Sequence, residues 1–254
     1  MTEKQTPLAG IPSDWNSNVP STTEFQAGVN WAHDRLVEEP WVISKVRPGE
    51  RILDIGSATS RYLVKFPSDC EIYGIDIRPG PPQPGVALMR GDIMQAPFRP
   101  GTFDTITCIS TIEHMGCFVY GQHVDRFGDE VTMRHMRLLL RPGGRLLLTT
   151  PYGKGAAYSW IRIYSPRMFQ RLIAGYRTRS VEYYRRDGER YVPCSPRELR
   201  NADIDMQKLR SDGIILTELT PSGGLSFLLG RISLRIRRFL HERAGRPKFW
   251  IDPA

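Results

Sequence analysis

Three aspartates lie in or just after short aliphatic runs, at positions 54, 76 and 92. A carboxylate accepts two hydrogen bonds at once, which suits the vicinal hydroxyls of a ribose. Asp76 comes 22 residues after Asp54, and in dinucleotide-type folds an acid about 20 residues past the first turn binds those hydroxyls. Asp92 can accept a hydrogen bond from the exocyclic amine of adenine, with Ile77 and Ile93 against the two faces of the ring. The spacing therefore predicts a nucleoside site.

The stretch "RILDIGSATSRYLV", residues 51–64, is typical of a buried strand that enters a turn of small residues and then a helix. Nucleotide-binding folds usually carry two or three glycines there, whereas this turn has only Gly56, followed by Ser57. Gly56 lets the backbone approach a ligand, Ala58 adds one methyl group, and Ser60 can cap free N–H groups. We interpret the turn as altered and still able to bind a cofactor. The alternative is a degenerate fold that binds nothing.

Side chains that can move a proton follow the fourth aliphatic run, in "FDTITCISTIEHMG". Ser110 and Thr111 lie where the predicted strand of this segment ends, and they are expected to face the cofactor. His114, beside Glu113, is the first candidate base, because the pKa of histidine lies near working pH. His123 is the second candidate base. The alternative for His114 is a helix cap or a cofactor contact.

A substrate loop is expected at residues 116–130, "GCFVYGQHVDRFGDE", because polar and aromatic residues gather on it. A solvated connection is the alternative. His123, Asp125 and Asp129 have no diagnostic metal-ligand spacing, so no metal is expected. After the fifth run, aromatic residues with an arginine suit polar cyclic acceptors, although Trp160 and Tyr164 could equally be core residues. The predicted acceptor-binding residues are Trp31, Glu113, Tyr120, Asp125, Tyr152, Tyr158, Arg162 and Tyr164.

These residues need a sheet to position them. Short aliphatic runs bounded by Gly, Pro or Asp alternate with helical or looped stretches, which favours parallel strands covered on both faces. A helix is predicted from Ser165, a hairpin around Asp187-Gly188, and a last strand at "GIILTELT". The expected fold is an α/β, Rossmann-like doubly wound sheet of five parallel strands plus a terminal antiparallel pair, with helices on both faces. The five strands are predicted at 51–55, 71–77, 86–90, 103–110 and 144–150.

The order of these segments resembles the class I S-adenosylmethionine-dependent methyltransferase family, of the small-molecule type. The first motif of that family, Asp-x-Gly-x-Gly-x-Gly, corresponds to residues 54–60 here, and its second and third acids correspond to Asp76 and Asp92. The run "LLRPGGRLLLTTP" matches the approach to the family's fifth strand. The resemblance covers roughly residues 51–153 and implies S-adenosylmethionine as cofactor. The predicted cofactor-binding residues are Asp54, Gly56, Ser57, Asp76, Ile77, Asp92, Ile93, Ser110 and Thr111.

The formal net charge of +8 is concentrated toward the end of the chain. Residues 231–248 hold six arginines and one lysine against one glutamate, and apolar residues form one helical stripe between 225 and 240. This tail could dock on the body, pair with another subunit, contact nucleic acid or lie on a membrane surface. We expect an N-terminal arm and lid helix at 1–45, a methyltransferase domain at 46–220 and the basic amphipathic tail at 221–254.

The remaining expectations concern compartment, partners and activity. No apolar run of 18 residues, no signal-peptide pattern and no CxxC pair occur among the residues, so a cytoplasmic protein with reduced cysteines is expected. We expect a monomer or homodimer that methylates a hydroxyl or amine of a small polar natural product, such as an amino sugar, antibiotic or glycan precursor. A nucleic-acid or protein methyltransferase that uses the tail is one alternative, although no Asn-Pro-Pro-Tyr motif occurs. A non-catalytic cofactor-binding module is another.

Overall fold

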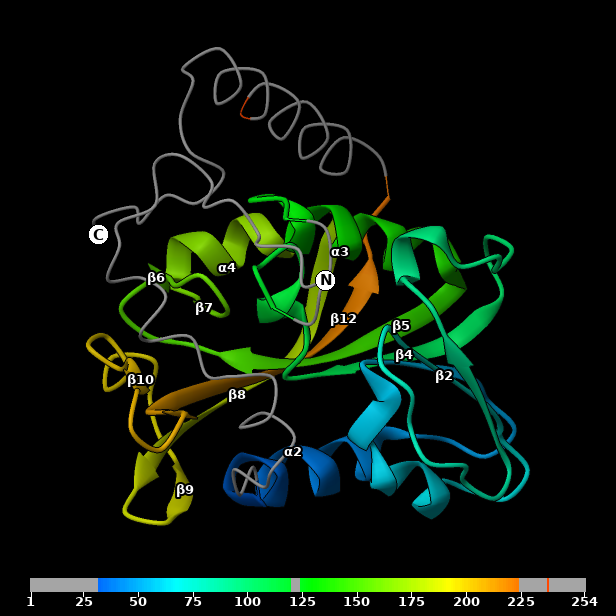
Figure 1. The fold of residues 1–254 in the computed structure, drawn as a ribbon, viewed down its shortest axis with the longest axis horizontal. Coiled ribbons are helices and arrows are strands. Elements are labelled where there is room, and N and C mark those ends of the chain that lie inside the picture. Colours follow the sequence, from blue (N-terminus) through cyan, green and yellow to red (C-terminus); the bar gives the residue numbers. More distant parts are fainter. Residues whose placement is uncertain (1–31, 120–123, 224–236, 238–254) are drawn as a thin grey trace, which may run out of the picture.

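The computed structural model describes residues 32–119, 124–223 and 237. Its centre is an eight-stranded sheet in the order β3-β2-β1-β4-β5-β12-β8-β9 (Figure 1). The strands from β3 to β5 run parallel, whereas β12 is antiparallel to β5 and to β8. The bounds are β1 Arg51–Ile55, β2 Glu71–Asp76, β3 Val86–Arg90, β4 Phe103–Ile109, β5 Leu140–Pro151, β8 Tyr176–Asp187, β9 Arg190–Pro193 and β12 Gly213–Pro221.

This sheet confirms the predicted fold class. The strands β1 and β3 have the predicted bounds, and the predicted hairpin is β8–β9, turning at Asp187 and Gly188. The hairpin adds β9 at the edge, so three strands follow β5 in the sheet where a pair was predicted. Two further short pairs lie outside the main sheet: β6 Ala156–Ala157 with β7 Arg162–Ile163, and β10 Ile204–Asp205 with β11 Arg210–Ser211.

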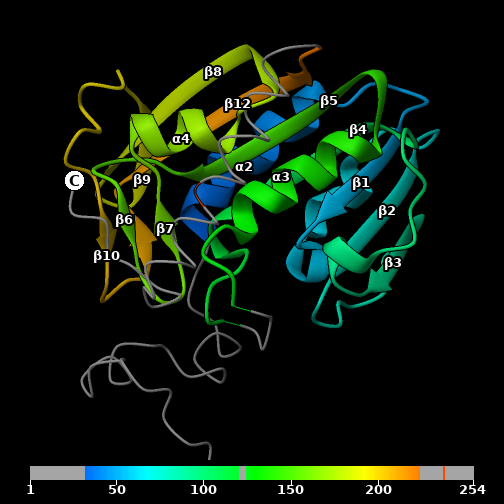
Figure 2. The same cartoon turned by 90° about the horizontal axis from the view of Figure 1, so that it is seen from above.

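Alpha-helices cover both faces of the sheet (Figures 1 and 2). Helix α2 (Ala32–Lys45) lies on one face, and α3 (Gly128–Leu139) and α4 (Pro166–Leu172) lie on the other. Helix α4 begins as predicted, because the Ser165 side chain accepts a hydrogen bond from the Met168 N–H and Pro166 occupies the first turn. None of the described helices is long and apolar enough to cross a membrane.

The segment from β1 to β4 has no α-helix, and its connections are short 3-10 helices or irregular chain. The helix predicted after β1 is instead η2 (Ser57–Thr59) and η3 (Arg61–Lys65), and Pro67 follows the second. Between β2 and β3 the stretch "RPGPPQPG" contains four prolines, which lack the N–H donors that a helix needs. The 3-10 helices η4 (Ile93–Gln95) and η5 (Ile112–His114) complete the loops on the functional side.

Two apolar clusters lie on opposite faces of the sheet because successive side chains of a strand point in opposite directions. Ile52 packs in the cluster that contains Trp41 and Val42 of α2. Leu53, its neighbour in β1, packs in the cluster that contains Met133 and Met136 of α3, together with other core residues. A third cluster contains Cys117, Trp160 and Ile163 around the β6–β7 hairpin.

The end of α2 is attached to the sheet by a buried ion pair. Arg145 donates to Glu50 (2.9 Å) and to the Lys45 carbonyl (2.7 Å), and Thr105 also donates to Glu50 (3.0 Å). Further along the sheet, Trp41 Nε1 donates to Glu182 of β8 (2.8 Å). These contacts hold α2 across the sheet, so that its first turns reach the functional edge.

Candidate cofactor and acceptor site

The turn after β1 brings two predicted cofactor residues into contact. Gly56 has φ 87°, in the left-handed region, and its N–H donates to the Ile75 carbonyl (2.9 Å). A Cβ at this position would lie 2.3 Å from Thr111 Oγ1. A side chain larger than hydrogen is therefore excluded both by backbone conformation and by Thr111. Since β1 lies between β2 and β4, the turn sits at the point where strand order reverses, where ligands bind in open α/β sheets.

Asp76 joins the turn to the end of β2. Its Oδ2 accepts the Ala58 N–H (3.0 Å) and its Oδ1 accepts the Arg78 N–H (2.8 Å). The Arg78 guanidinium lies 3.5 Å from the same carboxylate. Each carboxylate oxygen can accept more than one hydrogen bond, so these contacts fix the orientation of Asp76 and leave acceptor capacity for a diol.

The two predicted adenine contacts differ in exposure. Asp92 accepts the Met94 N–H (2.9 Å) and so caps η4. Ile93 is buried in the core cluster with Ile75, whereas Ile77 is half-buried. Asp92 and Ile77 are thus better placed to meet a ligand than the Ile93 side chain, which already packs against protein.

A buried ionic cluster underlies the ends of β1 and β4, and sequence reasoning missed two of its members. Arg35 Nη1 of α2 contacts Glu38 Oε2 (2.8 Å), and Glu38 is fully buried. Ser110, whose φ of 39° is in the left-handed region, donates to the other Glu38 oxygen (2.6 Å). An acid and a base three residues apart on a helix are the only sequence signal, and it is indistinguishable from a surface pair.

Two carboxyl groups near this cluster, Glu113 and Asp34, have raised pKa values and are shifted toward their neutral forms. The pKa of Glu113 is raised to about 8, chiefly by burial and in part by the nearby Glu38 carboxylate. Burial also raises the pKa of Asp34 to about 7, again with a contribution from Glu38. Thr150 donates to Glu113 (3.1 Å). Several buried acids thus share the Arg35 guanidinium, and a further cation would be stabilised there.

Asp54 is the acid nearest the turn. Thr107 and Tyr62 each donate a 2.6 Å hydrogen bond to its Oδ1. Its Oδ2 is buried and has no hydrogen-bond partner among the described residues. Burial raises the pKa of Asp54, and the bonds from Thr107 and Tyr62 oppose that rise. An unused buried acceptor of this kind points to a donor from outside residues 32–119 and 124–223.

His114, the first candidate base, is buried against the β6–β7 hairpin. Its Nδ1 lies 2.6 Å from the Trp160 carbonyl, and the two rings are stacked with centroids 6.0 Å apart. A carbonyl can only accept, so Nδ1 carries the proton and Nε2 is the basic nitrogen. Burial lowers the pKa of His114 to about 4, and the positive charges of Arg78, Arg162 and Arg35 contribute. The imidazole is therefore neutral at physiological pH.

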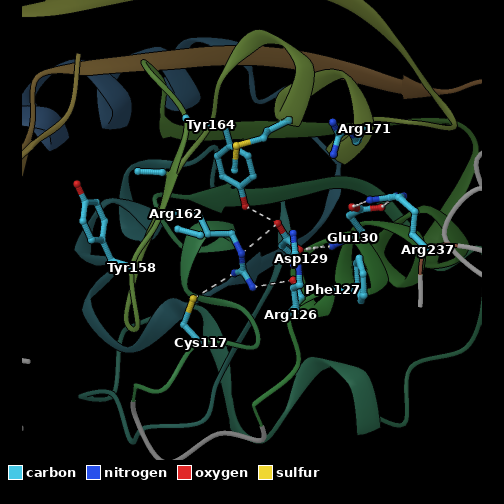
Figure 3. A pocket seen from close by; sticks show the side chains of 14 residues that line it. Cys117, Arg126, Phe127, Asp129, Glu130, Tyr158, Arg162, Tyr164, Arg171 and Arg237 are labelled. Carbon is cyan, nitrogen blue, oxygen red and sulfur yellow. Dashed lines mark hydrogen bonds and ion pairs between the residues drawn. The ribbon is translucent and has the colours of Figure 1, made fainter. Parts of the chain in front are cut away.

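The predicted acceptor-binding residues lie in several different places. Tyr158, Arg162 and Tyr164 line a cavity of about 90 Å³ between the β6–β7 hairpin and the starts of α3 and α4 (Figure 3). Tyr152 packs edge-on against Phe169 in the core. Glu113 belongs to the ionic cluster, and Asp125 caps the Phe127 N–H (2.9 Å). Trp31, Tyr120 and the second candidate base His123 lie outside the described residues.

Two of the cavity residues have structural partners. Tyr164 donates to Asp129 (2.8 Å), and Arg162 Nε lies 3.6 Å from the same carboxylate. Arg162 also donates to backbone carbonyls of Met115 (2.7 Å) and Arg126 (3.1 Å). Trp160, left open as core or acceptor wall, is buried in the third apolar cluster. Within residues 32–119 and 124–223, no three His, Cys, Asp or Glu side chains are grouped to hold a metal ion.

Comparisons with sequences give a partial match. Residues 97–216 match the family described as "Caenorhabditis protein of unknown function, DUF268". Demethylmenaquinone methyltransferase from Beutenbergia cavernae is 28% identical over 109 residues, which is 40% of this chain and 41% of that protein. The match thus spans less than half the length of that relative.

Solved structures extend the likeness to most of the chain. An S-adenosylmethionine-dependent methyltransferase from Methanosarcina mazei matches with a TM-score of 0.50 and 10% identity, covering 72% of this chain and 98% of that one. The 4+2 cyclase SpnF matches with a TM-score of 0.50 and 16% identity, covering 75% and 81%. The chain therefore has the fold of the class I S-adenosylmethionine-dependent methyltransferases.

Proposed function

We propose that the protein is an S-adenosylmethionine-dependent methyltransferase that acts on a hydroxyl or amine of a small polar molecule. The observation that carries the proposal is the meeting of the Gly56 turn, the Asp76 carboxylate and Thr111 at the switch point of the sheet. These residues come from three segments that are far apart in sequence. In open α/β sheets, nucleosides bind at the switch point where such segments meet.

The residues at the junction fit the chemical groups of the proposed cofactor. Asp76 would bind the ribose diol and Asp92 the adenine amine. The methionine end carries an ammonium and a carboxylate, for which Asp54 Oδ2 offers an unused acceptor and Arg35 a cation. The cofactor, when bound, supplies a methyl group on a positively charged sulfur. The surplus of buried carboxylates around Arg35 favours a positive charge at this end of the site.

The remaining task is to prepare the acceptor. His114 is held neutral with its Nδ1 on the Trp160 carbonyl, so Nε2 can take a proton from an acceptor hydroxyl or accept a hydrogen bond from an amine. Its lowered pKa makes it a weak base that is nevertheless always in the basic form. Burial of the site excludes water, which strengthens each polar contact made within it.

The size of the neighbouring cavity supports a small acceptor. A hollow of about 90 Å³ admits a functional group of a small molecule, and its tyrosines and arginines suit a polar one. A natural-product precursor such as an amino sugar or an antibiotic intermediate is of this kind. The four cysteines are free, which favours a cytoplasmic location.

The test of cofactor binding is a calorimetric titration of the full chain with S-adenosylhomocysteine. Asp76→Asn should weaken binding by about tenfold or more, because the change removes the negative charge and one of the two acceptor oxygens. Asp69→Asn, at an exposed position, is the control and should bind like the wild type. Equal affinity of all three proteins would remove Asp76 from the site. No binding by the wild type would remove the proposal.

Methyl transfer needs a separate assay, because a fold does not determine an activity and a cyclase shares this one. A panel of small polar alcohols and amines, with labelled S-adenosylmethionine, should give at least one methylated product. Binding of the cofactor without transfer to any small acceptor, RNA or protein would favour a non-catalytic module.

A further inference from the structure

The cavity beside the candidate site has an asymmetric lining (Figure 3). The hairpin side presents Tyr158 and Cys117, and the helical side presents Arg171 of α4 and Arg237 (Figure 3). Arg162 and Tyr164 lie between them (Figure 3). The lining thus mixes apolar and polar side chains, with positive groups gathered toward the helices.

The charges of the lining do not cancel. Four arginines and two carboxylates line the cavity, and the pairs that can be identified use both carboxylates. Arg162 lies 3.6 Å from Asp129, and Arg237 makes two hydrogen bonds to Glu130, one of 2.7 Å. An excess of positive charge in a lining attracts an anion.

Two arginines, Arg126 and Arg171, stand outside these ion pairs, and Arg126 lies against the Phe127 ring, with its guanidinium carbon 5.9 Å from the ring centroid. The guanidinium of Arg171 is exposed at the rim of the cavity and has no hydrogen-bond or ion-pair partner within the described part of the chain. Its neighbour Arg237 is held in place by Glu130 and by the Phe127 ring, 5.6 Å from the guanidinium carbon. A planar guanidinium without a partner, beside a fixed second one, is suited to a carboxylate or phosphate group.

The size of the cavity limits what enters it. A cavity of about 150 Å³ holds one benzene ring in a well-studied case, whereas this one measures about 90 Å³. It therefore accommodates a single charged group or short branch, with the rest of the molecule outside.

The cavity also adjoins the loop of the candidate base. The Arg162 guanidinium lines the cavity and donates to the carbonyl of Met115 (2.7 Å) and, more weakly, to that of Glu113 (3.3 Å). These carbonyls flank His114. A molecule with one end in the cavity would therefore have its other end near the loop that carries His114.

We propose that this cavity binds a carboxylate or phosphate group of the methyl acceptor, through Arg171 at its rim. The proposal rests on the proposed function for the identity of the ligand as an acceptor. The binding of the charged group itself is independent of it.

The experiment uses the full chain with inorganic phosphate and, separately, acetate as probes, followed by calorimetry at constant ionic strength. Saturable binding of at least one probe is expected. Arg171→Gln should weaken it about tenfold or more, and Arg171→Lys less, because the ammonium keeps the charge and loses the fork of donors. Arg167→Gln, one turn earlier on α4, exposed and outside the lining, is the matched control and should leave binding unchanged.

The outcomes separate this inference from the proposed function. Preference for phosphate or for acetate identifies which charged group the acceptor carries. Absence of saturable binding, equal binding in Arg171→Gln, or equal weakening in Arg167→Gln would overturn the inference. Titration of the same variants with S-adenosylhomocysteine should give wild-type affinity throughout. Failure of the wild type to bind S-adenosylhomocysteine would instead contradict the proposed function.

Discussion

At the scale of single residues, Gly56 is where the backbone and the site constrain one another most. Its positive φ places the N–H toward Ile75, and the missing side chain leaves the space that Thr111 occupies. The motif has lost its other glycines, yet this one cannot be replaced without moving β4. A residue without a side chain is therefore required only at the first position of the turn, and Ala58 and Ser60 occupy positions that tolerate a side chain.

Replacement of Gly56 by alanine should damage both folding and binding. A left-handed conformation costs a non-glycine residue about 1–2 kcal/mol, and the contact with Thr111 adds to this. Gly101 is a matched control, because it has φ 69° and a Cβ there would meet nothing within 4 Å. Urea denaturation should show a larger loss for Gly56→Ala than for Gly101→Ala, and only the former should lose affinity for S-adenosylhomocysteine. Equal effects of the two changes would contradict the role of Thr111.

At the scale of elements, Arg162 connects the β6–β7 hairpin to the long loop after β4. Its guanidinium donates to the carbonyls of Met115 and Arg126 and lies 3.6 Å from the carboxylate of Asp129. Arg162 therefore holds the two residues that flank positions 116–125. The guanidinium is suited to this because it has five donors in one plane. These contacts explain why a charged residue is buried here, because each side of the guanidinium meets an acceptor.

Arg162→Met keeps much of the side-chain volume and removes these donors. The free energy of unfolding should fall by about 3–5 kcal/mol, the usual effect of removing one partner of a buried ion pair. Chemical denaturation measures this change. Arg167→Met on the exposed face of α4 should change stability by less than about 0.5 kcal/mol. A small effect at Arg162 would mean that the loop is held by other contacts.

At the scale of the whole molecule, the buried acids make stability depend on pH. The folded protein keeps a proton on Glu113 up to about pH 8, whereas the unfolded chain releases it above about pH 4.5. Between these values the folded state binds more protons, so the free energy of unfolding falls as pH rises. The slope from one such group is at most about 1.4 kcal/mol per pH unit.

Glu113→Gln should therefore flatten this dependence between pH 5 and pH 8, as measured by urea denaturation at unit intervals. Asp34, with its pKa raised to about 7, keeps part of the slope. Glu71→Gln is the control: the pKa of Glu71 is lowered by its hydrogen bond from Arg51, so it is ionised in both states across the range. An unchanged slope in Glu113→Gln would mean that Glu113 is already ionised in the folded protein.

The parts of the molecule that were predictable from sequence are those governed by local pattern. Aliphatic runs bounded by turn residues gave the bounds of β1 and β3, and Asp187-Gly188 gave the hairpin, because both signals are contained in a few neighbouring residues. The acids at 76 and 92 were recognisable by spacing alone. The helix expected after β1 was wrong because the segment between Ser60 and Pro67 is too short for a stable one.

The parts that were not predictable depend on contacts between distant residues. Glu38 meets Ser110 across 72 positions, and nothing in the local sequence of either residue indicates the other. Arg171 and Arg237 come together at the cavity although 66 positions separate them, because each lies close to the start of α3 in the folded chain. The ionic cluster and the cavity thus required the folded chain, whereas the cofactor-binding roles of Asp76 and Asp92 stay predictions.

Arg162 holds the loop after β4 largely through the backbone carbonyl oxygens of the loop. The anchoring therefore does not depend on which side chains the loop carries. Substitutions between Met115 and Arg126 can therefore accumulate while these two anchor points stay in place. Under the proposed function, natural variation or laboratory selection would re-tune which molecule is accepted while these anchors are kept.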